Sequence, residues 1–167
     1  MRKIAARGLA LAAAFLLTVP VFAGPVYTPA AGTPQRKAIL DGLRAGNELK
    51  LRYLVDTLNV FDGKSGSVAY LIAAPAKGEI DGGTYILTRT GKGKAWKLVW
   101  ADTGGGSNTC AAGAVHYRWA MGLFRRFGVA PEKMIPGITE QVKTFEATAK
   151  AEPDMMCTGD LGGGAEQ

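Results

Sequence analysis

The stretch TYILTRTGKGKAWKLVWAD, residues 84–102, has the clearest hairpin pattern in the chain. Residues 84–90 and 95–101 carry the alternation of half-buried strands, and the Gly- and Lys-rich segment between them is typical of a tight turn. The stretch therefore predicts an antiparallel hairpin. Trp96, Leu98 and Trp100 recur at period two, so we expect all three on one face of the sheet, packed under a helix.

The segments before the hairpin predict that helix and two further strands. Residues 35–45 have helical periodicity after a capping threonine and a proline, and we expect this helix to cover the tryptophan face. The apolar alternation that starts at Leu49 slips by one position at Asp56 and Thr57, which indicates a β-bulge. The run SVAYLIAAP, residues 67–75, is apolar on both faces, so we place it inside the sheet.

The segments after the hairpin predict two helices. The glycine-rich stretch 103–116 is expected to turn the chain from the sheet edge into a helix over 113–127, which ends at Gly128. A third helix is expected over 138–151, docked by a narrow apolar stripe. That stripe consists of Ile138, Val142, Phe145 and Ala149.

Together these patterns predict an α+β fold. An N-terminal helix packs on a four-stranded antiparallel meander, and two C-terminal helices stapled by a disulfide follow. We expect a signal peptide over 1–23, a flexible lead-in over 24–32, a single domain over 33–157 and a disordered tail over 158–167.

The N-terminus has the pattern of a Sec-type signal peptide. A basic start precedes an apolar run, and small residues lead to a predicted cleavage after Ala23. The apolar run has about a dozen residues, fewer than the roughly 20 that a membrane-spanning helix needs. We therefore expect a periplasmic or secreted protein with no transmembrane span in the mature chain.

The two cysteines, Cys110 and Cys157, are expected to form a disulfide. An even count in an exported chain favours pairing because the compartment is oxidising. Such a bond would attach the tail to the domain and would consume the thiol that a cysteine nucleophile needs.

The charge distribution excludes one class of partner. Twenty basic and fourteen acidic residues leave little net charge once the basic signal segment is removed, so we expect no nucleic-acid binding. Basic residues predominate over 24–130 and acidic ones over 131–167. A protein or envelope partner could contact the basic body. The candidate contact residues are Arg118, Trp119, Arg125, Arg126, Lys92 and Lys94.

The residues that could do chemistry are few. His116 is the only histidine, and no metal-ligand spacing accompanies it, so we expect no metal and no cofactor. Cys110, His116 and Asp102 are the residue types of a thiol-protease active site, but a disulfide at Cys110 would remove the nucleophile. Ser65, Ser67 and Ser107 lack a nucleophile-elbow motif. The remaining enzyme candidates are the strand-end carboxylates Asp56, Asp62, Glu79, Asp81 and Asp102.

Three segments carry a resemblance: RKAILDGLR (36–44), LNVFDGKSGSVAYLIAAP (58–75) and the Trp-containing hairpin. Together they resemble a group of uncharacterised exported bacterial proteins with an R-x-A-I-L-D-x-L-R helix before an antiparallel meander. The likeness covers about residues 34–102 and implies no catalytic residues. This chain has Val68-Ala69-Tyr70 where the group has a Trp-Ala step. A helix laid over a meander is also similar to cystatin-like architecture, which implies no activity.

These observations favour an exported, non-catalytic binding or accessory protein of the bacterial envelope, such as an inhibitor or immunity-type factor. Two alternatives stay open. One is a small hydrolase that acts through the carboxylate of Asp56, Asp81 or Asp102 in the concavity between the first helix and the sheet, and His116 is a further weak enzyme candidate. The other is a peripheral binder of anionic lipid through the basic, aromatic helix over 113–127.

Overall fold

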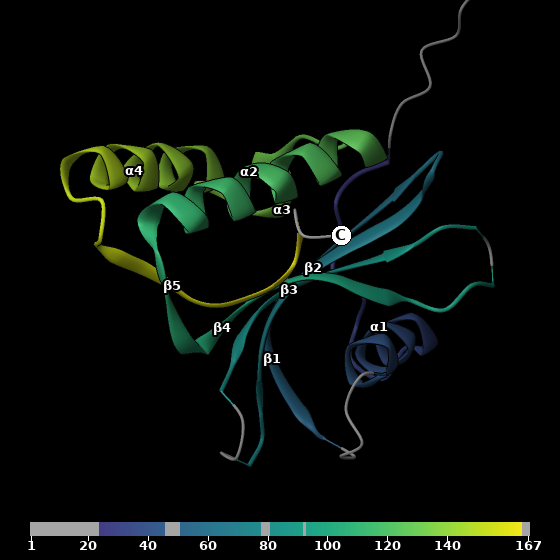
Figure 1. The fold of residues 1–167 in the computed structure, drawn as a ribbon. Helices are drawn as coiled ribbons and strands as arrows, with labels where there is room; N and C mark the ends of the chain where they lie inside the picture. Colours follow the sequence, from purple (N-terminus) through teal and green to yellow (C-terminus); the bar gives the residue numbers. More distant parts are fainter. Residues whose placement is uncertain (1–23, 46–50, 78–80, 92, 165–167) are drawn as a thin grey trace, which may run out of the picture.

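The computed structural model describes residues 24–45, 51–77, 81–91 and 93–164, so the predicted signal peptide lies outside the described residues. An antiparallel sheet in the order β1-β2-β3-β4-β5 separates helix α1 from helices α2, α3 and α4 (Figure 1). The elements are α1 (Pro34–Arg44), β1 (Tyr53–Gly63), β2 (Gly66–Pro75), β3 (Gly83–Arg89), β4 (Lys97–Thr109), α2 (Cys110–Phe127), α3 (Pro131–Met134), α4 (Ile138–Ala151) and β5 (Met156–Gly163). The predicted α+β class is confirmed, with one strand more than expected.

Helix α1 begins where its sequence signals placed it. The Thr33 hydroxyl accepts a hydrogen bond from the backbone N–H of Arg36, and Pro34 occupies the first turn. Ile39 and Leu43 are buried against the sheet. We call the face of the sheet that α1 covers the α1 face, and the opposite one the α2 face.

The bulge in β1 is confirmed. Val55 pairs with Ala73 and Thr57 pairs with Ile72, so Asp56 is the extra residue. Strand β2 lies between β1 and β3, as its continuous apolar sequence predicted, and ends at Pro75.

The prediction that Trp96, Leu98 and Trp100 share one face is wrong. A second bulge lies in β4, where Ile86 pairs with Trp100 and Leu87 pairs with Leu98. Because a one-residue slip moves the following side chains to the other face, Trp96 packs on the α1 face and Trp100 on the α2 face. Leu98 stays 42% exposed.

The glycine-rich stretch does not turn the chain before the helix. Instead β4 continues to Thr109 and pairs with β5, which includes residues 158–163 of the segment whose composition predicted a disordered tail. Close approach explains the glycines, since a Cβ on Gly159 would overlap the carbonyl oxygen of Thr103. Helix α2 then begins directly at Cys110, three residues earlier than predicted, and ends at the left-handed Gly128 as predicted.

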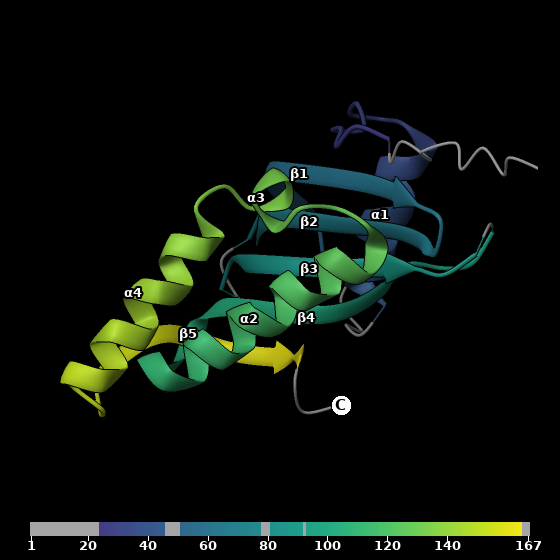
Figure 2. The same cartoon turned by 90° about the horizontal axis from the view of Figure 1, so that it is seen from above.

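Three helices lie on the α2 side of the sheet, but they cover its strands unequally. Helix α2 crosses the strands, α3 lies near β1, and α4 lies beside α2 toward the outside of the molecule (Figure 2). The predicted stripe on α4 is buried at Ile138, Val142 and Phe145, and the Tyr117 and Phe145 rings meet edge to face at 5.6 Å.

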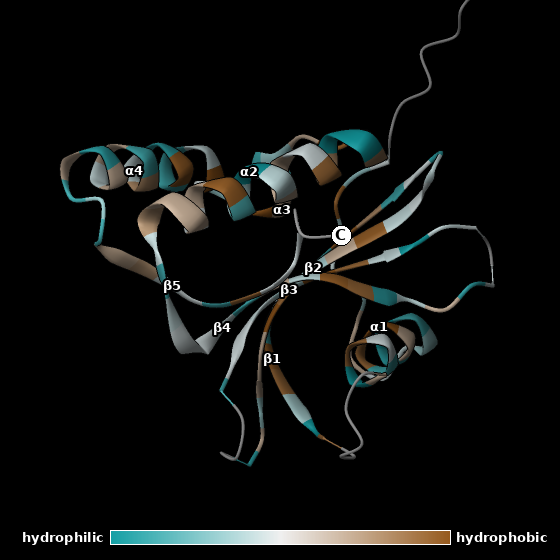
Figure 3. Cartoon of the chain, viewed as in Figure 1, coloured by the Kyte–Doolittle hydropathy of each residue, from teal (hydrophilic) through white to brown (hydrophobic). Residues whose placement is uncertain are grey.

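The buried side chains form one hydrophobic cluster on each side of the sheet. Apolar residues accordingly recur along the strands and on the sheet-facing sides of the helices (Figure 3). In the lead-in, Tyr27 forms an isolated bridge with Val60, while the flexibility predicted for 24–32 stays a prediction. None of the helices in the described ranges is long and apolar enough to span a bilayer.

Candidate functional site

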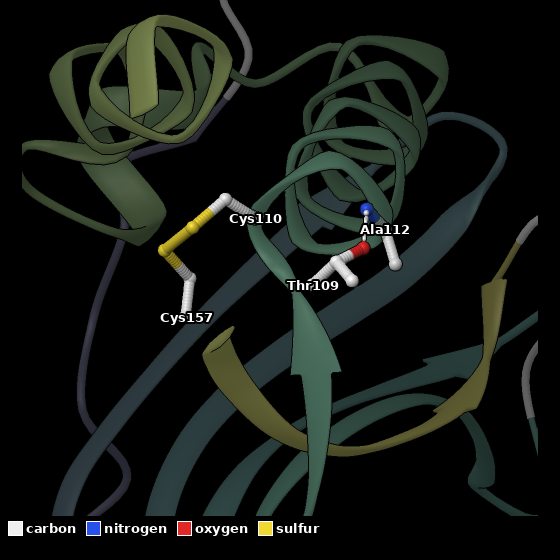
Figure 4. The surroundings of a disulfide bond; sticks show 4 residues. All are labelled: Thr109, Cys110, Ala112 and Cys157. Atoms are coloured by element: carbon white, nitrogen blue, oxygen red, sulfur yellow. Dashed lines mark hydrogen bonds between the residues drawn. A yellow bond between two sulfur atoms is a disulfide. The ribbon is translucent and has the colours of Figure 1, made fainter. Parts of the chain in front are cut away.

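The predicted disulfide is present and fixes one side of the candidate site. Cys110 is the first residue of α2 and Cys157 lies on β5, with their Cα atoms 4.7 Å apart (Figure 4). The Thr109 hydroxyl caps the helix by accepting from the Ala112 N–H, and the Cys110 N–H donates to the Met155 carbonyl. These links attach β5 to the start of α2.

A groove of about 720 Å³ opens on the α2 face, beyond the part of the sheet that the helices cover. We call it the strand-end groove. It is formed by the start of β1, the end of β2, the start of β3, the middle of β4, one side chain of α2, and β5. Its lining residues are 54–56, 72–74, 82–84, 102–104, Tyr117 and 157–159.

The floor of the strand-end groove is apolar and exposed. Leu54 is 57% and Ile72 37% exposed, whereas most large apolar side chains of the sheet are buried. Thr84 pairs with Ile72 across β2 and β3, so it lies beside the apolar floor. An exposed apolar surface inside a hollow is a common property of ligand sites.

A hydrogen-bonded carboxylate forms the polar part of the groove. The Tyr117 hydroxyl donates to Oδ2 of Asp102 at 2.8 Å, and the Gly159 N–H donates to Oδ1 at 3.3 Å. Elements distant in sequence therefore position Asp102 from two sides. Burial, together with the negative charge of Asp102, raises the pKa of Tyr117, so its hydroxyl stays protonated and remains a donor.

Tyr70 lies under the same region on β2. Burial raises its pKa to about 12, and the charge of Asp102 contributes in the same direction. Neither tyrosine was identified in the sequence as part of a site. Tyr117 lies within the helix predicted over 113–127, and nothing in the local pattern shows that its hydroxyl reaches Asp102.

The predicted carboxylates do not gather at one point. Asp56 and Asp102 both line the strand-end groove, but Asp81 does not. The carboxylates of Asp81 and Asp160 lie near Gly105 instead. The groove is on the α2 face, so the predicted location between the first helix and the sheet is wrong for Asp56 and Asp102. For Asp102 the bulge in β4 causes the difference, because it moves Trp100 and Asp102 to the face opposite α1.

His116 is not a polar residue of the helix surface. It is 6% exposed, its ring stacks on Trp100 with centroids 4.7 Å apart, and its Nε2 lies 2.9 Å from the Ala101 carbonyl oxygen. The Trp100 indole N–H in turn donates to the His116 carbonyl. These contacts give the side chain a packing role, and it does not line the groove.

A second polar cluster lies at the β1–β2 hairpin. Both the Ser67 hydroxyl and the Tyr27 hydroxyl donate to Asp62, each at 2.5 Å, and Arg89 donates to Ser67 at 3.1 Å. Ser67 is therefore held by structural partners. The Ser65 hydroxyl donates to the Arg126 carbonyl, and Ser107 is exposed, while Glu79 lies outside the described residues.

The basic candidates lie on the outer side of α2. Arg118, Arg125 and Arg126 are exposed, and the Arg126 guanidinium lies over the Trp119 ring at 5.5 Å. Arg118 pairs with Glu146 of α4 at 3.4 Å. Lys94 is exposed near the β3–β4 turn, and Lys92 lies outside the described residues.

No family model, curated protein or solved structure matches this chain. Within the described ranges, no group of three or more potential metal-ligating side chains is assembled. The interpretation of the site therefore depends on its own geometry.

Proposed function

We propose that this protein is an exported, non-catalytic binding or accessory protein of the bacterial envelope and that the strand-end groove is its binding site. One observation carries the proposal: an exposed apolar floor adjoins a carboxylate that Tyr117 and Gly159 hold in place. Apolar walls with a few positioned polar groups are the usual composition of a small-molecule binding site.

The disulfide supports export, since such bonds persist in oxidising compartments. The basic start of the sequence and the predicted cleavage after Ala23 support a periplasmic or secreted location. The weak resemblance to exported bacterial proteins over residues 34–102 agrees with this proposal. An inhibitor or immunity-type role would fit it as well.

A groove-filling variant tests the proposal. Ala74 is exposed and lines the groove, so Ala74→Trp should occupy it. Immobilised mature protein is incubated with periplasmic extract, and retained molecules are identified by mass spectrometry. We expect saturable retention by the unaltered protein and loss of it in Ala74→Trp. Ala151→Trp, at an exposed position outside the groove, is the matched control. Equal retention by both variants would contradict the proposal.

A second candidate function is carboxylate-based hydrolysis. It is favoured by the presence of Asp56 and Asp102 in one groove, with the protonated Tyr117 hydroxyl beside Asp102. A broad hydrolase substrate screen tests it, and turnover should fall at least 100-fold in Asp56→Asn or Asp102→Asn if it is correct, on the scale of a lost general acid or base. Asp81→Asn is the matched control, because Asp81 does not line the groove.

A further inference from the structure

The strand-end groove has a single sign of charge. Its carboxyl side chains are Asp56 and Asp102, and among the described residues that line it there is no Lys, Arg or His. Tyr117 adds a neutral hydroxyl, because its raised pKa keeps it protonated. Basic residues predominate over 24–130, so the groove differs in its charge from the body of the molecule around it.

Asp102 is positioned but not neutralised. Each of its oxygens accepts one hydrogen bond, from Tyr117 or from Gly159, and a carboxylate oxygen can accept a second. Among the described side chains, no cation lies within ion-pair distance of Asp102, although five other ion pairs occur. A half-buried carboxylate of this kind favours a ligand that brings a positive charge.

The size and floor of the groove define the rest of the ligand. A volume of about 720 Å³ lies within the range of roughly 300–1,000 Å³ typical of small-molecule sites. The exposed side chains of Leu54 and Ile72 offer an apolar surface to one part of such a molecule. The cation and the apolar part would then contact adjacent regions of one groove.

From these observations we propose that the strand-end groove binds a small amphipathic organic cation, an amine that carries an apolar chain, with its ammonium group on Asp102 and its chain on Leu54 and Ile72. This inference rests on the proposed binding function and specifies its ligand class. The cation can donate to the free acceptor positions of Asp102 without displacing Tyr117 or Gly159.

Three probes with the same chain test the proposal: octylammonium, octanol and octanoate. Each is titrated into isotopically labelled full-length mature protein below its micelle-forming concentration, and backbone resonances are followed by NMR. We expect octylammonium to shift the resonances of Ala73, Thr84 and Thr158, and to bind about 10- to 100-fold more tightly than octanol, as for a charge-assisted hydrogen bond. Octanoate should bind more weakly than octanol.

Variants locate the charge effect. Asp102→Asn keeps the shape of the side chain and should weaken octylammonium binding about 10- to 100-fold while leaving octanol binding nearly unchanged. Asp154→Asn removes an exposed carboxylate outside the groove and is the matched control. If Asp102→Asn does not fold, the ranking of the three probes on the unaltered protein decides the question.

The outcomes separate the two proposals. Equal binding of all three probes in the groove, or no effect of folded Asp102→Asn, would overturn the cation class and leave the groove as an apolar binding site. Binding of a basic peptide in the groove without octylammonium binding would overturn the small-molecule class. If no probe shifts groove resonances, the ligand class is wrong, and the Ala74→Trp retention experiment then decides whether the groove binds anything.

Discussion

The two faces of the sheet are covered to different extents, and the difference locates the candidate site. On the α1 face, one short helix packs closely on the sheet: Gly42 lies so near Trp96 that a Cβ there would be 2.7 Å from the Trp96 Cβ. On the α2 face there are three helices, but α4 packs beside α2 and does not lie on the strands (Figure 2). Part of the sheet on the α2 face therefore stays exposed although more helices lie on that side, because α4 covers α2 and not the strands.

The largest expected effect is on the core of the α2 face. Trp100 is 1% exposed, stacks on His116 and donates its indole N–H to the His116 carbonyl. Trp100→Ala should lower the free energy of unfolding by about 3–5 kcal/mol, the cost of a large cavity. Urea denaturation followed by circular dichroism measures it.

A matched pair of substitutions sharpens this result. The indole nitrogen of Trp96 is buried and has no hydrogen-bond partner among the described residues, in contrast to that of Trp100. Trp100→Phe should therefore cost about 1 kcal/mol more than Trp96→Phe, because only the former breaks a buried hydrogen bond. Equal costs would show that the two faces do not differ in this respect.

The disulfide lies on the α2 face, and we expect it to stabilise the folded domain as a whole. It joins residues 47 positions apart, and its replacement by Cys110→Ala with Cys157→Ala should lower the free energy of unfolding by about 2–4 kcal/mol. Since β5 lines the strand-end groove, ligand binding should weaken in the same variant. Urea denaturation with and without reductant checks the stability, and reductant should not affect the double variant. Two titratable thiols in the purified native protein would contradict the bond.

The free energy of unfolding at alkaline pH should depend more on a buried tyrosine of the α2 face than on one of the α1 face. Burial raises the pKa of Tyr70 to about 12, so the unfolded chain, in which tyrosine titrates near pH 10, loses this proton first. The contribution of Tyr70 to the free energy of unfolding is therefore fully present below pH 10. It decreases as the pH rises toward 12, by up to about 1.4 kcal/mol per pH unit. Tyr70→Phe should flatten the decrease measured by urea denaturation more than Tyr53→Phe does on the α1 face, where the pKa is raised less. The same slope in both variants would argue against the difference.

The smallest effect on stability is expected at the outer side of α2, which tests the proposed contact with anionic lipid. Arg125→Glu with Arg126→Glu should change the free energy of unfolding by no more than about 0.5 kcal/mol, because both side chains are exposed. If the helix contacts lipid, this variant should lose binding to anionic vesicles in sedimentation at low salt, and high salt should weaken binding of the unaltered protein. Lys143→Glu with Lys150→Glu on α4 is the matched control, and no salt-sensitive sedimentation would exclude the role.

Local signals were sufficient for the features that depend on neighbouring residues. Thr33 and Pro34 start α1, Asp56 forms the β1 bulge and Gly128 ends α2, and each follows from a backbone preference within a few residues. Local sequence signals did not predict segments whose structure depends on a partner far away in the chain. Strand β5 is rich in glycine and therefore shows little alternation of apolar and polar side chains. It is a strand because it pairs with β4, which its glycines let it approach closely.

The candidate site likewise combines residues that the sequence identified with residues that only the structure reveals. Asp56 and Asp102 were identified in the sequence as strand-end carboxylates, but Tyr117, Gly159 and the exposed floor at Leu54 and Ile72 were not. A single unrecognised bulge opposite Ile86 moved Trp100 and Asp102 to the other face, so the predicted site was placed on the wrong side of the sheet. Burial of His116 likewise depends on Trp100, fifteen or more positions away, which no helical pattern can show.

The amino-acid sequence by itself determined the class of the fold, most element boundaries and the pairing of Cys110 with Cys157, because capping, alternation and the number of cysteines are properties of the chain. The tertiary structure alone decided which face each side chain occupies and where the sheet stays uncovered. Those depend on strand register and on helix-to-helix packing, and both arise from contacts between segments far apart in the chain.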